Sequence, residues 1–313
     1  MKIGFIGLGA MGLPMTRRLL AAGHTVAVAS RSRPPIDAAI AAGALDGRDA
    51  RGVVEKSDVT LICVPFSPDV GIVLDTIGPA MRPGKILVDC STIEPDAEVA
   101  FHTRVAATGA SYLEAPLSGG PLAARDGTLA VMAGGAAGVF EKVRPALEPF
   151  AREIMHMGRP GSGQSAKLCN NLIHAAQNLA VAEACALAAR AGVDIARFRK
   201  IVMHSTGDCT AIRNRIPVEG IFADSPASNG WLGFPTDMMI KEMDMVLRLG
   251  DRQDVPLAST ALVRELLRRA SAAGLGHEDF SVMGKLLRDP IRHSDVHRWL
   301  KRLSGELRSG KDS

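Results

Sequence analysis

The chain has 313 residues, of which 47% are hydrophobic and 22% charged, as expected for a globular protein with room for two domains. Its net charge of +4 and its twelve aromatic residues (one Tyr, two Trp and nine Phe) give little support to nucleic-acid binding. The five cysteines follow no Cys-x-x-Cys or Cys/His spacing, so we expect neither a metal site nor a disulfide framework. No cleavage site follows the apolar N-terminus, and a cytoplasmic location is expected.

The N-terminus carries a dinucleotide-binding pattern. A strand is predicted over Lys2–Ile6, and it runs into Gly7-Leu8-Gly9-Ala10-Met11-Gly12 before a helix over Met11–Ala22. Gly7 permits a tight turn, Gly9 leaves room for a pyrophosphate, and Gly12 lets the helix pack closely on the strand. The alternative is a purely structural glycine turn. Because the pattern lies between a strand and a helix, we favour the dinucleotide.

The end of the second predicted strand, Thr25–Ala29, indicates which dinucleotide binds. An NAD site usually has a carboxylate there for the ribose 2′-OH, whereas this chain continues Ser30-Arg31-Ser32. A guanidinium flanked by two hydroxyls can bind a 2′-phosphate. The alternative is a solvated basic turn. We therefore expect NADP(H) to be preferred, with NAD(H) possible.

Strand and helix patterns alternate through the first half of the chain. Strands are predicted at Val59–Val64, Lys85–Cys90, Ser111–Leu117, Thr128–Ala133 and Glu153–Met157, and helices at Asp69–Ile77 and Asp96–Thr108. This alternation is typical of βαβ units in a mostly parallel, doubly wound sheet. The fold class is therefore α/β, with a Rossmann domain over residues 1–162.

The pattern changes after the glycine-rich stretch that ends at Gly163. A long helix is predicted over Gln164–Ala191, closed by Gly192 in a left-handed conformation. Its many polar residues argue against a membrane span. We expect it to bridge into an all-helical domain over residues 163–290, followed by a basic tail over 291–313, and its alanine-rich face suggests a homodimer or homotetramer. Further helices are predicted at Asp194–Ser205, Met238–Gly250, Pro256–Ala273 and Asp279–Arg288.

The long helix presents a possible acid/base group. Lys167, Asn170, Asn171 and His174 share one helix face, with Lys167 one turn from the start. The helix dipole and partial burial both disfavour the charged amine, as a proton donor to a carbonyl oxygen requires. The alternative is a lysine whose amine reaches solvent, beside two amides that cap neighbouring loops.

Two loops after predicted strands could bind a small carboxylate. Ser118-Gly119-Gly120 exposes successive backbone N–H groups and a hydroxyl, although a plain tight turn would have the same sequence. Ser91 and Thr92 lie at the carboxyl end of a predicted parallel strand, where ligands of such sheets bind. A hydroxyl capping the helix that begins near Glu94-Pro95 is the simpler role for this pair.

Together these motifs resemble the β-hydroxyacid dehydrogenase family, which includes 3-hydroxyisobutyrate dehydrogenase and NADPH-dependent semialdehyde reductases. The resemblance runs from Met1 to about Arg288. It is carried by the glycine loop, Asp89-Cys90-Ser91-Thr92, Ala115 to Gly120 with Gly127-Thr128-Leu129, and Gly161 to Asn171. It implies that Lys167 is the catalytic acid/base, that Asn171 orients the substrate, that Ser118, Gly119 and Gly120 hold its carboxylate, and that Thr92 lies beside the nicotinamide.

A fifth family element matches Phe234 and Lys241-Glu242, with Glu242 and Met243 where family members usually have Asp and Leu. The stretch from Ser225 to Gly233, with Trp231, also departs from the family, which leaves the substrate open. The expected cofactor site adds Val64, Pro65, Phe234 and Lys241, and the substrate site adds Asn170 and Lys241. An imine reductase of similar fold, which usually lacks the lysine, and a non-catalytic NADP-binding protein are the alternatives.

Overall fold

The computed structural model describes residues 1–229, 233–288 and 294–309. Its contacts divide the chain into two compact units, Met1–Lys167 and Leu168–Ser313, and each is described by itself.

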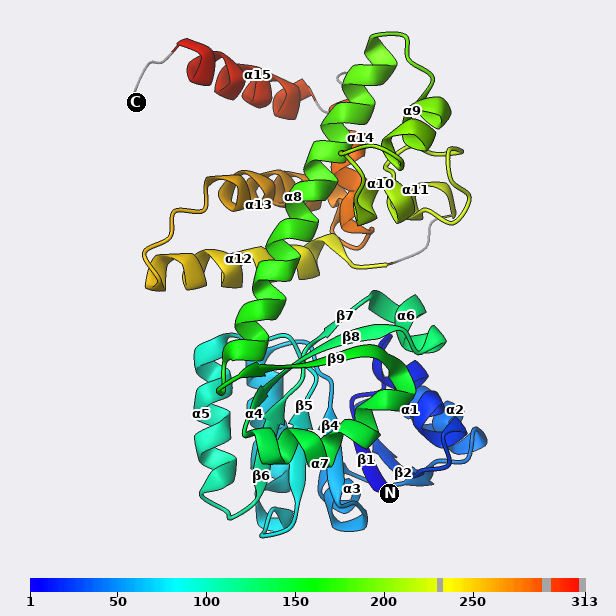
Figure 1. The fold of residues 1–313 in the computed structure, drawn as a ribbon, viewed down its shortest axis with the longest axis vertical. Helices are drawn as coiled ribbons and strands as arrows, with labels where there is room; N and C mark the ends of the chain where they lie inside the picture. The colour runs from blue at the N-terminus through cyan, green and yellow to red at the C-terminus, as the bar shows by residue number, and fades with distance from the viewer. Residues whose placement is uncertain (230–232, 289–293, 310–313) are drawn as a thin grey trace. The chain divides into compact units, whose positions relative to one another are not determined.

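The first unit is built on one sheet (Figure 1). Its strands follow the order β3-β2-β1-β4-β5-β6-β8-β7, with β9 paired to β8. The β6–β8 and β7–β8 pairs are antiparallel, and the other pairs are parallel. The predicted doubly wound sheet is therefore confirmed. The strands are β1 Lys2–Ile6, β2 Thr25–Ala29, β3 Leu45–Asp46, β4 Val59–Ile62, β5 Ile86–Asp89, β6 Ser111–Glu114, β7 Leu117–Ser118, β8 Leu129–Gly135 and β9 Ala151–Gly158.

The predicted single strand over Ser111–Leu117 is wrong, because the structure divides it into β6 and β7. Pro116 lies between them, and a proline has no N–H to donate to a continuing ladder. Each piece pairs with a different part of β8: Glu114 opposes Gly134, and Ser118 opposes Ala130. Both pieces keep the same register with β8, whereas the pairing of β6 with β5 ends at Glu114.

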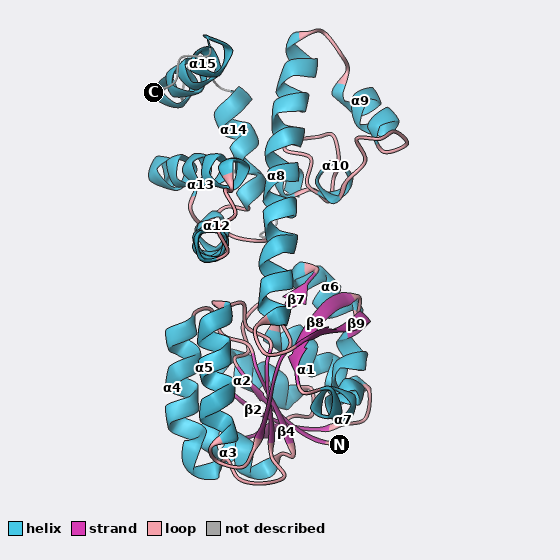
Figure 2. Ribbon diagram, turned by 60° about the vertical axis from the view of Figure 1, so that its left-hand side comes forward, coloured by secondary structure: helices cyan, strands magenta, loops and turns pink. Residues whose placement is uncertain are grey.

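Helices cover both faces of this sheet, as Figure 2 shows with α4 and α5 on one side of the strands and α1 and α7 on the other. Alternation along β1 explains the two faces, because Phe5 packs with α1, α2, α6 and α7 while Ile6 packs with α3, α4 and α5. The sequence patterns did not indicate α2, α3, α6 or α7. The helices are α1 Gly12–Ala21, α2 Arg33–Ala41, α3 Ala50–Lys56, α4 Ser67–Ile77, α5 Pro95–Ala106, α6 Gly120–Asp126 and α7 Ala137–Leu147, with 3₁₀ turns η1 Gly78–Ala80 and η2 Glu148–Phe150.

The long helix is α8, Ser162–Arg190, close to the predicted bounds. It ends as expected, since Gly192 has a φ of 79°, in the left-handed region that favours glycine. By length and composition alone, α8 is apolar enough to cross a membrane. Buried core helices of soluble proteins can have the same length and composition. Its seven polar and charged residues from Lys167 to Glu183 would be costly in hydrocarbon.

The second unit is helical in its described part, which has no strand and one isolated bridge, between Pro235 and Asp279. Its main core joins α8, α12, α13 and α14 through apolar side chains such as Met243, Leu267 and Phe280. The elements are α9 Ile195–Val202, α10 Thr210–Asn214, α11 Pro226–Asn229, α12 Thr236–Arg252, α13 Ala258–Ala270, a π-helical turn η3 Ser271–Leu275, a 3₁₀ turn η4 Phe280–Val282, α14 Met283–Arg288 and α15 Ser294–Ser309.

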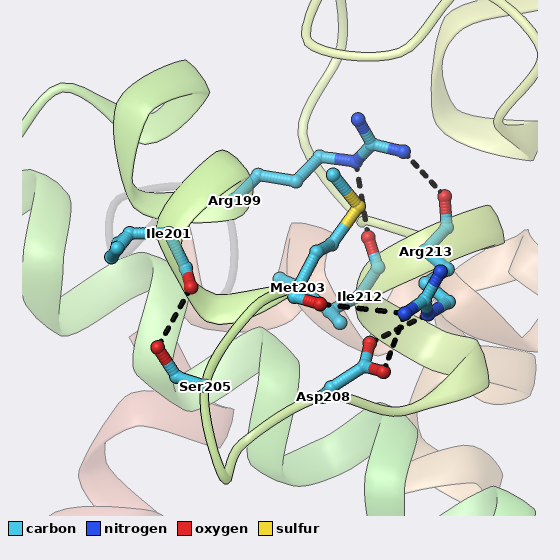
Figure 3. A network of polar contacts seen from close by, with 7 residues as sticks. All are labelled: Arg199, Ile201, Met203, Ser205, Asp208, Ile212 and Arg213. Atoms are coloured by element: carbon cyan, nitrogen blue, oxygen red, sulfur yellow. Dashed lines mark hydrogen bonds and ion pairs between the residues drawn. The ribbon is translucent and has the colours of Figure 1, made fainter.

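Two arginines close the α9–α10 corner (Figure 3). Arg199 donates to the carbonyls of Ile212 and Arg213, at 3.1 and 2.6 Å, and its guanidinium lies 4.5 Å from the centre of the Phe222 ring. Arg213 makes a bidentate ion pair with Asp208 at 2.7 Å. The two Arg199 hydrogen bonds satisfy carbonyls in the last turn of α10, where the helix itself has no N–H groups left to donate. The ion pair fixes Arg213 beside them.

The described part of the basic tail packs on the second unit. Trp299 of α15 lies under the guanidinium of Arg269, 4.4 Å from its centre, and His297 Nε2 is 2.8 Å from the carbonyl oxygen of Leu286. Trp299 and Leu300 also contact the main core of that unit. The apolar face of residues 298–303 is therefore partly buried.

Candidate active site

The glycine loop between β1 and α1 has the geometry that its spacing predicts. Gly7 has a φ of 99°, and a Cβ there would lie 2.3 Å from the carbonyl oxygen of Cys63. A Cβ on Gly12 would lie 2.0 Å from the carbonyl oxygen of Gly7, whereas a Cβ on Gly9 would meet nothing within 4 Å. Gly7 and Gly12 are thus required by the fold, and the space beside Gly9 is open for a ligand.

The end of β2 lies beside this loop. The Ser30 hydroxyl accepts a hydrogen bond from the Leu8 N–H at 3.4 Å. The Arg31 side chain is 82% exposed and lies 3.4 Å from Asp69, in the first turn of α4. Ser32 precedes α2, and Arg33 is held by Asp37 and Asp46 at 2.7 Å each. Arg31 is therefore an exposed guanidinium directly after Ser30, the residue that contacts the loop, and its partner Asp69 was not anticipated.

The carboxyl ends of β4 and β5 meet through Ser91. Its hydroxyl accepts the Val64 N–H at 3.0 Å, and its own N–H donates to Asp89 at 2.8 Å. The expectation that the Ser91 or the Thr92 hydroxyl caps the following helix is wrong for Ser91, because its hydroxyl bonds the Val64 N–H and the residue before α5, Glu94, makes no side-chain cap. The hydroxyl instead satisfies the N–H freed where β4 ends. Thr92 and Pro65, each the next residue along the chain, lie at this same edge of the sheet.

Three side-chain contacts fix the start of α8 against the first unit. The Gly163 N–H donates to Glu114 Oε1 at 2.7 Å. The Gln164 side chain donates to the carbonyl of Ser91 at 2.9 Å and accepts the Ile93 N–H at 3.2 Å. Lys167 follows one turn later, only 8% exposed. The predicted acid/base residue is thus buried on a helix turn that is anchored to the carboxyl ends of β5 and β6.

The loop that was expected to hold a carboxylate has two left-handed glycines. Gly119 has a φ of 132° and Gly120 a φ of 71°. A Cβ on Gly119 would lie 2.6 Å from the Cβ of Ala123, whereas one on Gly120 would meet nothing within 4 Å. Gly119 is therefore required by packing, and Gly120 faces open space. Binding of a carboxylate by Ser118, Gly119 and Gly120 stays a prediction.

A cluster of buried acids lies beside the start of α8, and the sequence patterns did not single it out. It consists of Asp89, Glu98, Tyr112 and Glu114, all at most 2% exposed. The Tyr112 hydroxyl donates to Asp89 at 3.2 Å. Both oxygens of Glu98 and Oε2 of Glu114 meet no hydrogen-bond partner among the described residues.

Burial sets the protonation of this cluster. Loss of solvation raises the pKa of Glu114 to about 7, although hydrogen bonds from the Gly163 and Gly161 N–H groups oppose the rise. Burial, followed by repulsion from Asp89 and Glu114, raises the pKa of Glu98 well above its usual value. Burial, followed by repulsion from Asp89 and Glu98, raises the pKa of Tyr112 well above its usual value, so the hydroxyl stays protonated. Among the described residues, no group of acids, histidines and cysteines could hold a metal ion.

The second unit orients Asn171 through its neighbours. The Asn171 side-chain amide donates to the buried carboxylate of Glu242 on α12, and its oxygen accepts a hydrogen bond from Asn170 at 3.0 Å. Asn171 and Glu242 thus form a buried pair. The sequence indicates Glu242 only as a departure from the family pattern. Lys241 precedes Glu242 on the same helix.

Phe234, the first residue of the fifth family element, is held at its backbone. Its N–H donates to Asp279 at 2.8 Å, and Asp279 also pairs with Arg215. The phenyl ring packs edge-on against Phe280. Trp231, in the stretch that departs from the family, lies outside the described residues.

The sheet and its glycine loop are typical of a nicotinamide dinucleotide-dependent oxidoreductase. Family models support this assignment over nearly the whole described chain: residues 2–158 match the NAD binding domain of 6-phosphogluconate dehydrogenase. Residues 161–287 match the NAD-binding domain of NADP-dependent 3-hydroxyisobutyrate dehydrogenase. The chain belongs to the β-hydroxyacid dehydrogenase family.

Individual members of this family are similar to the chain along almost its full length. The chain is 37% identical to an NAD-dependent L-serine dehydrogenase of Pseudomonas aeruginosa, over 93% of this chain and 99% of the relative. It is 35% identical to 2-hydroxy-3-oxopropionate reductase of Escherichia coli, over 94% and 99%. A solved structure of 3-hydroxyisobutyrate dehydrogenase of Mycobacterium tuberculosis with L-serine has a TM-score of 0.85, at 33% identity over 92% and 99% of the two chains. The relatives support a hydroxyacid dehydrogenase reaction.

Proposed function

We propose that this protein is an NADP(H)-preferring dehydrogenase that interconverts a small β-hydroxy acid and its semialdehyde, with Lys167 as general acid and base. The observation that carries the proposal is the position of Lys167. It is buried one turn into a helix whose first turn is held by Glu114 and Gln164 at the carboxyl ends of β5 and β6. That edge of a doubly wound sheet is where nucleotides and their reaction partners bind.

The reaction follows from these residues. A nicotinamide cofactor held at the Gly7–Gly12 loop would supply hydride transfer to and from the hydroxyl-bearing carbon. Lys167 takes the hydroxyl proton as the carbonyl forms, and it donates that proton back to the oxygen in reduction. Asn171, oriented by Asn170 and Glu242, supplies a fixed amide for the substrate. The N–H groups of Gly119 and Gly120 and the Ser118 hydroxyl hold the carboxylate.

The reaction class can be tested with a substrate panel. Purified enzyme should be assayed with small hydroxy acids that include serine, with semialdehydes, with uncharged aldehydes and with cyclic imines, each with both cofactors. We expect turnover of the carboxylate-bearing alcohols and aldehydes. Turnover of imines alone would instead support an imine reductase, and cofactor binding without any turnover would support a non-catalytic protein.

Cofactor preference should depend on Arg31. We expect Arg31→Ala to raise the Kd of NADPH about tenfold and to leave that of NADH nearly unchanged, because one charge-assisted contact at an exposed site is lost. The matched control is Arg33→Ala, since Arg33 is already held by Asp37 and Asp46. Fluorescence titration of both cofactors measures the effect. Equal losses for NADPH and NADH would contradict the assignment.

Substrate binding should depend on the open space at Gly120. We expect Gly120→Val to raise KM for the carboxylate substrate at least about tenfold while the Kd of NADPH stays unchanged, because the new side chain enters that space. Gly84→Val is the matched control: its φ of 91° also disfavours a side chain, and its Cβ also meets nothing within 4 Å. If both variants behave alike, the effect is strain and not substrate recognition.

The alanine-rich face of α8 supports a homodimer or homotetramer, which sedimentation at assay concentration would test. We also propose a cytoplasmic location.

A further inference from the structure

We propose that Glu114 is a positioning residue of this enzyme: by accepting the N–H of Gly163 it holds the first turn of α8, and with it Lys167, at the carboxyl ends of β5 and β6. The inference deepens the proposed function, because it rests on Lys167 as the acid/base. Glu114 ends β6 and touches neither Asn171 nor the glycine loop in any described contact, so it acts through the helix and not on the substrate.

Two glycines, Gly134 and Gly163, leave space for this carboxylate. A Cβ on Gly134, opposite Glu114 in the β6–β8 ladder, would lie 1.9 Å from Glu114 Oε1. A Cβ on Gly163 would lie 3.1 Å from the same oxygen and 2.2 Å from the carbonyl oxygen of Met132. Two positions without side chains thus clear the space in which the carboxylate meets the helix. A helix N-terminus has N–H groups without partners inside the helix, and a negative acceptor there is favourable.

The groups around this carboxylate come from its own strand, β6, and from three other elements, β5, α5 and α8. Asp89 of β5 is its register partner in the sheet, Glu98 reaches the cluster from α5, and Tyr112 lies on β6. Cys90 follows β5, and burial raises the pKa of its thiol well above the usual value, so it stays neutral. Lys167 is the next charged residue along α8. Burial and the negative charge of Asp89 raise the pKa of Glu114, and the helix N–H groups lower it.

This balance makes the contact dependent on pH. The pKa of Glu114 is raised to about 7, from an ordinary value of 4.5. Because folding raises it, the contribution of this group to folding stability is fully present below about pH 4.5 and is lost as the pH rises through about 7. Over the same range the hydrogen bond to Gly163 strengthens, since an ionised acceptor binds an N–H more strongly than a neutral one.

The test compares Glu114→Gln, Glu114→Ala and the control Glu141→Gln, which removes an equal charge at an exposed position of α7. The first readout is amide exchange at Gly163 in the full-length protein with NADPH, corrected for the intrinsic pH dependence of exchange. Protection in the wild type and the control should rise between pH 5.5 and 8. It should stay level in Glu114→Gln and fall about tenfold in Glu114→Ala.

The second readout is activity. The kcat of Glu114→Gln relative to wild type should fall as the pH rises through about 7, because only the wild-type side chain ionises there and gains the stronger hydrogen bond from Gly163. Glu114→Ala should lose about tenfold or more in kcat with the Kd of NADPH unchanged, as expected when a reacting group is displaced.

A kcat ratio that does not change with pH, or unchanged exchange at Gly163 in Glu114→Gln at pH 8, would overturn the inference. The glutamine variant keeps the shape of the side chain, so it decides the question even where the alanine variant fails to fold. Failure of the proposed function is distinguishable, because Lys167→Ala would then keep its turnover while exchange at Gly163 still responded to Glu114.

Discussion

Replacing Lys167 with Ala is expected to lower kcat by about 10²–10⁴-fold in both directions of the reaction, the usual range for the loss of a positioned acid or base. The large loss is expected because the variant lacks the group that would protonate the substrate oxygen. Oxygen gains negative charge as hydride arrives at the aldehyde carbon, and the buried amine is the group proposed to neutralise it. Stopped-flow measurement of NADPH oxidation with a semialdehyde, in the first turnover, would isolate this step from product release.

The controls for this prediction separate chemistry from folding. The Kd of NADPH and the melting temperature should change little, because the Lys167 side chain is proposed to contact the reacting oxygen and not the phosphates. Lys167→Arg should restore little activity, since a guanidinium keeps its proton at working pH. The pH profile of oxidation should lose one ionisation in the Ala variant. Wild-type turnover in Lys167→Ala would leave this lysine as a structural residue.

The parts of the fold that the sequence predicts are those with strong local signals. The glycine loop, the apolar strand of β1 and the left-handed Gly192 each depend on a few neighbouring residues, and all three are confirmed. The missed helices have weaker signals. Helix α3 spans only Ala50–Lys56, and its one start signal in the sequence is the capping residue Asp49, whose side chain accepts the Gly52 N–H.

The candidate site was predictable only in part, for a physical reason. Lys167 and Asn171 lie on one helix, so their spacing alone places them on a common face. Glu114 and Glu242 reach that helix from β6 and α12, and each is distant in sequence from its partner. A glutamate at the end of an apolar strand is normally taken to face solvent. Only the strand order, with β8 between β6 and β9, brings Gly134 opposite Glu114.

Gly9 and Gly12 make a second pair of contrasting variants. We expect Gly9→Ala to raise the Kd of NADPH about 100-fold while the melting temperature stays unchanged. A Cβ there meets nothing within 4 Å in the protein, and the backbone is not in the left-handed region, so neither packing nor strain changes on substitution. The open space is the predicted position of the pyrophosphate, and overpacking of about 3 kcal/mol against it corresponds to the expected loss.

Gly12→Ala should behave differently, because its Cβ would lie 2.0 Å from the carbonyl oxygen of Gly7 and force β1 and α1 apart. It should lower the melting temperature as well as cofactor affinity. Gly138→Ala on α7 is the matched control for Gly9→Ala, since a Cβ at either glycine meets nothing within 4 Å. Calorimetric unfolding and fluorescence titration measure the two effects. If Gly9→Ala bound NADPH as tightly as the wild type, the dinucleotide phosphates would not lie against this loop, and the assignment of the cofactor site to Gly7–Gly12 would fail.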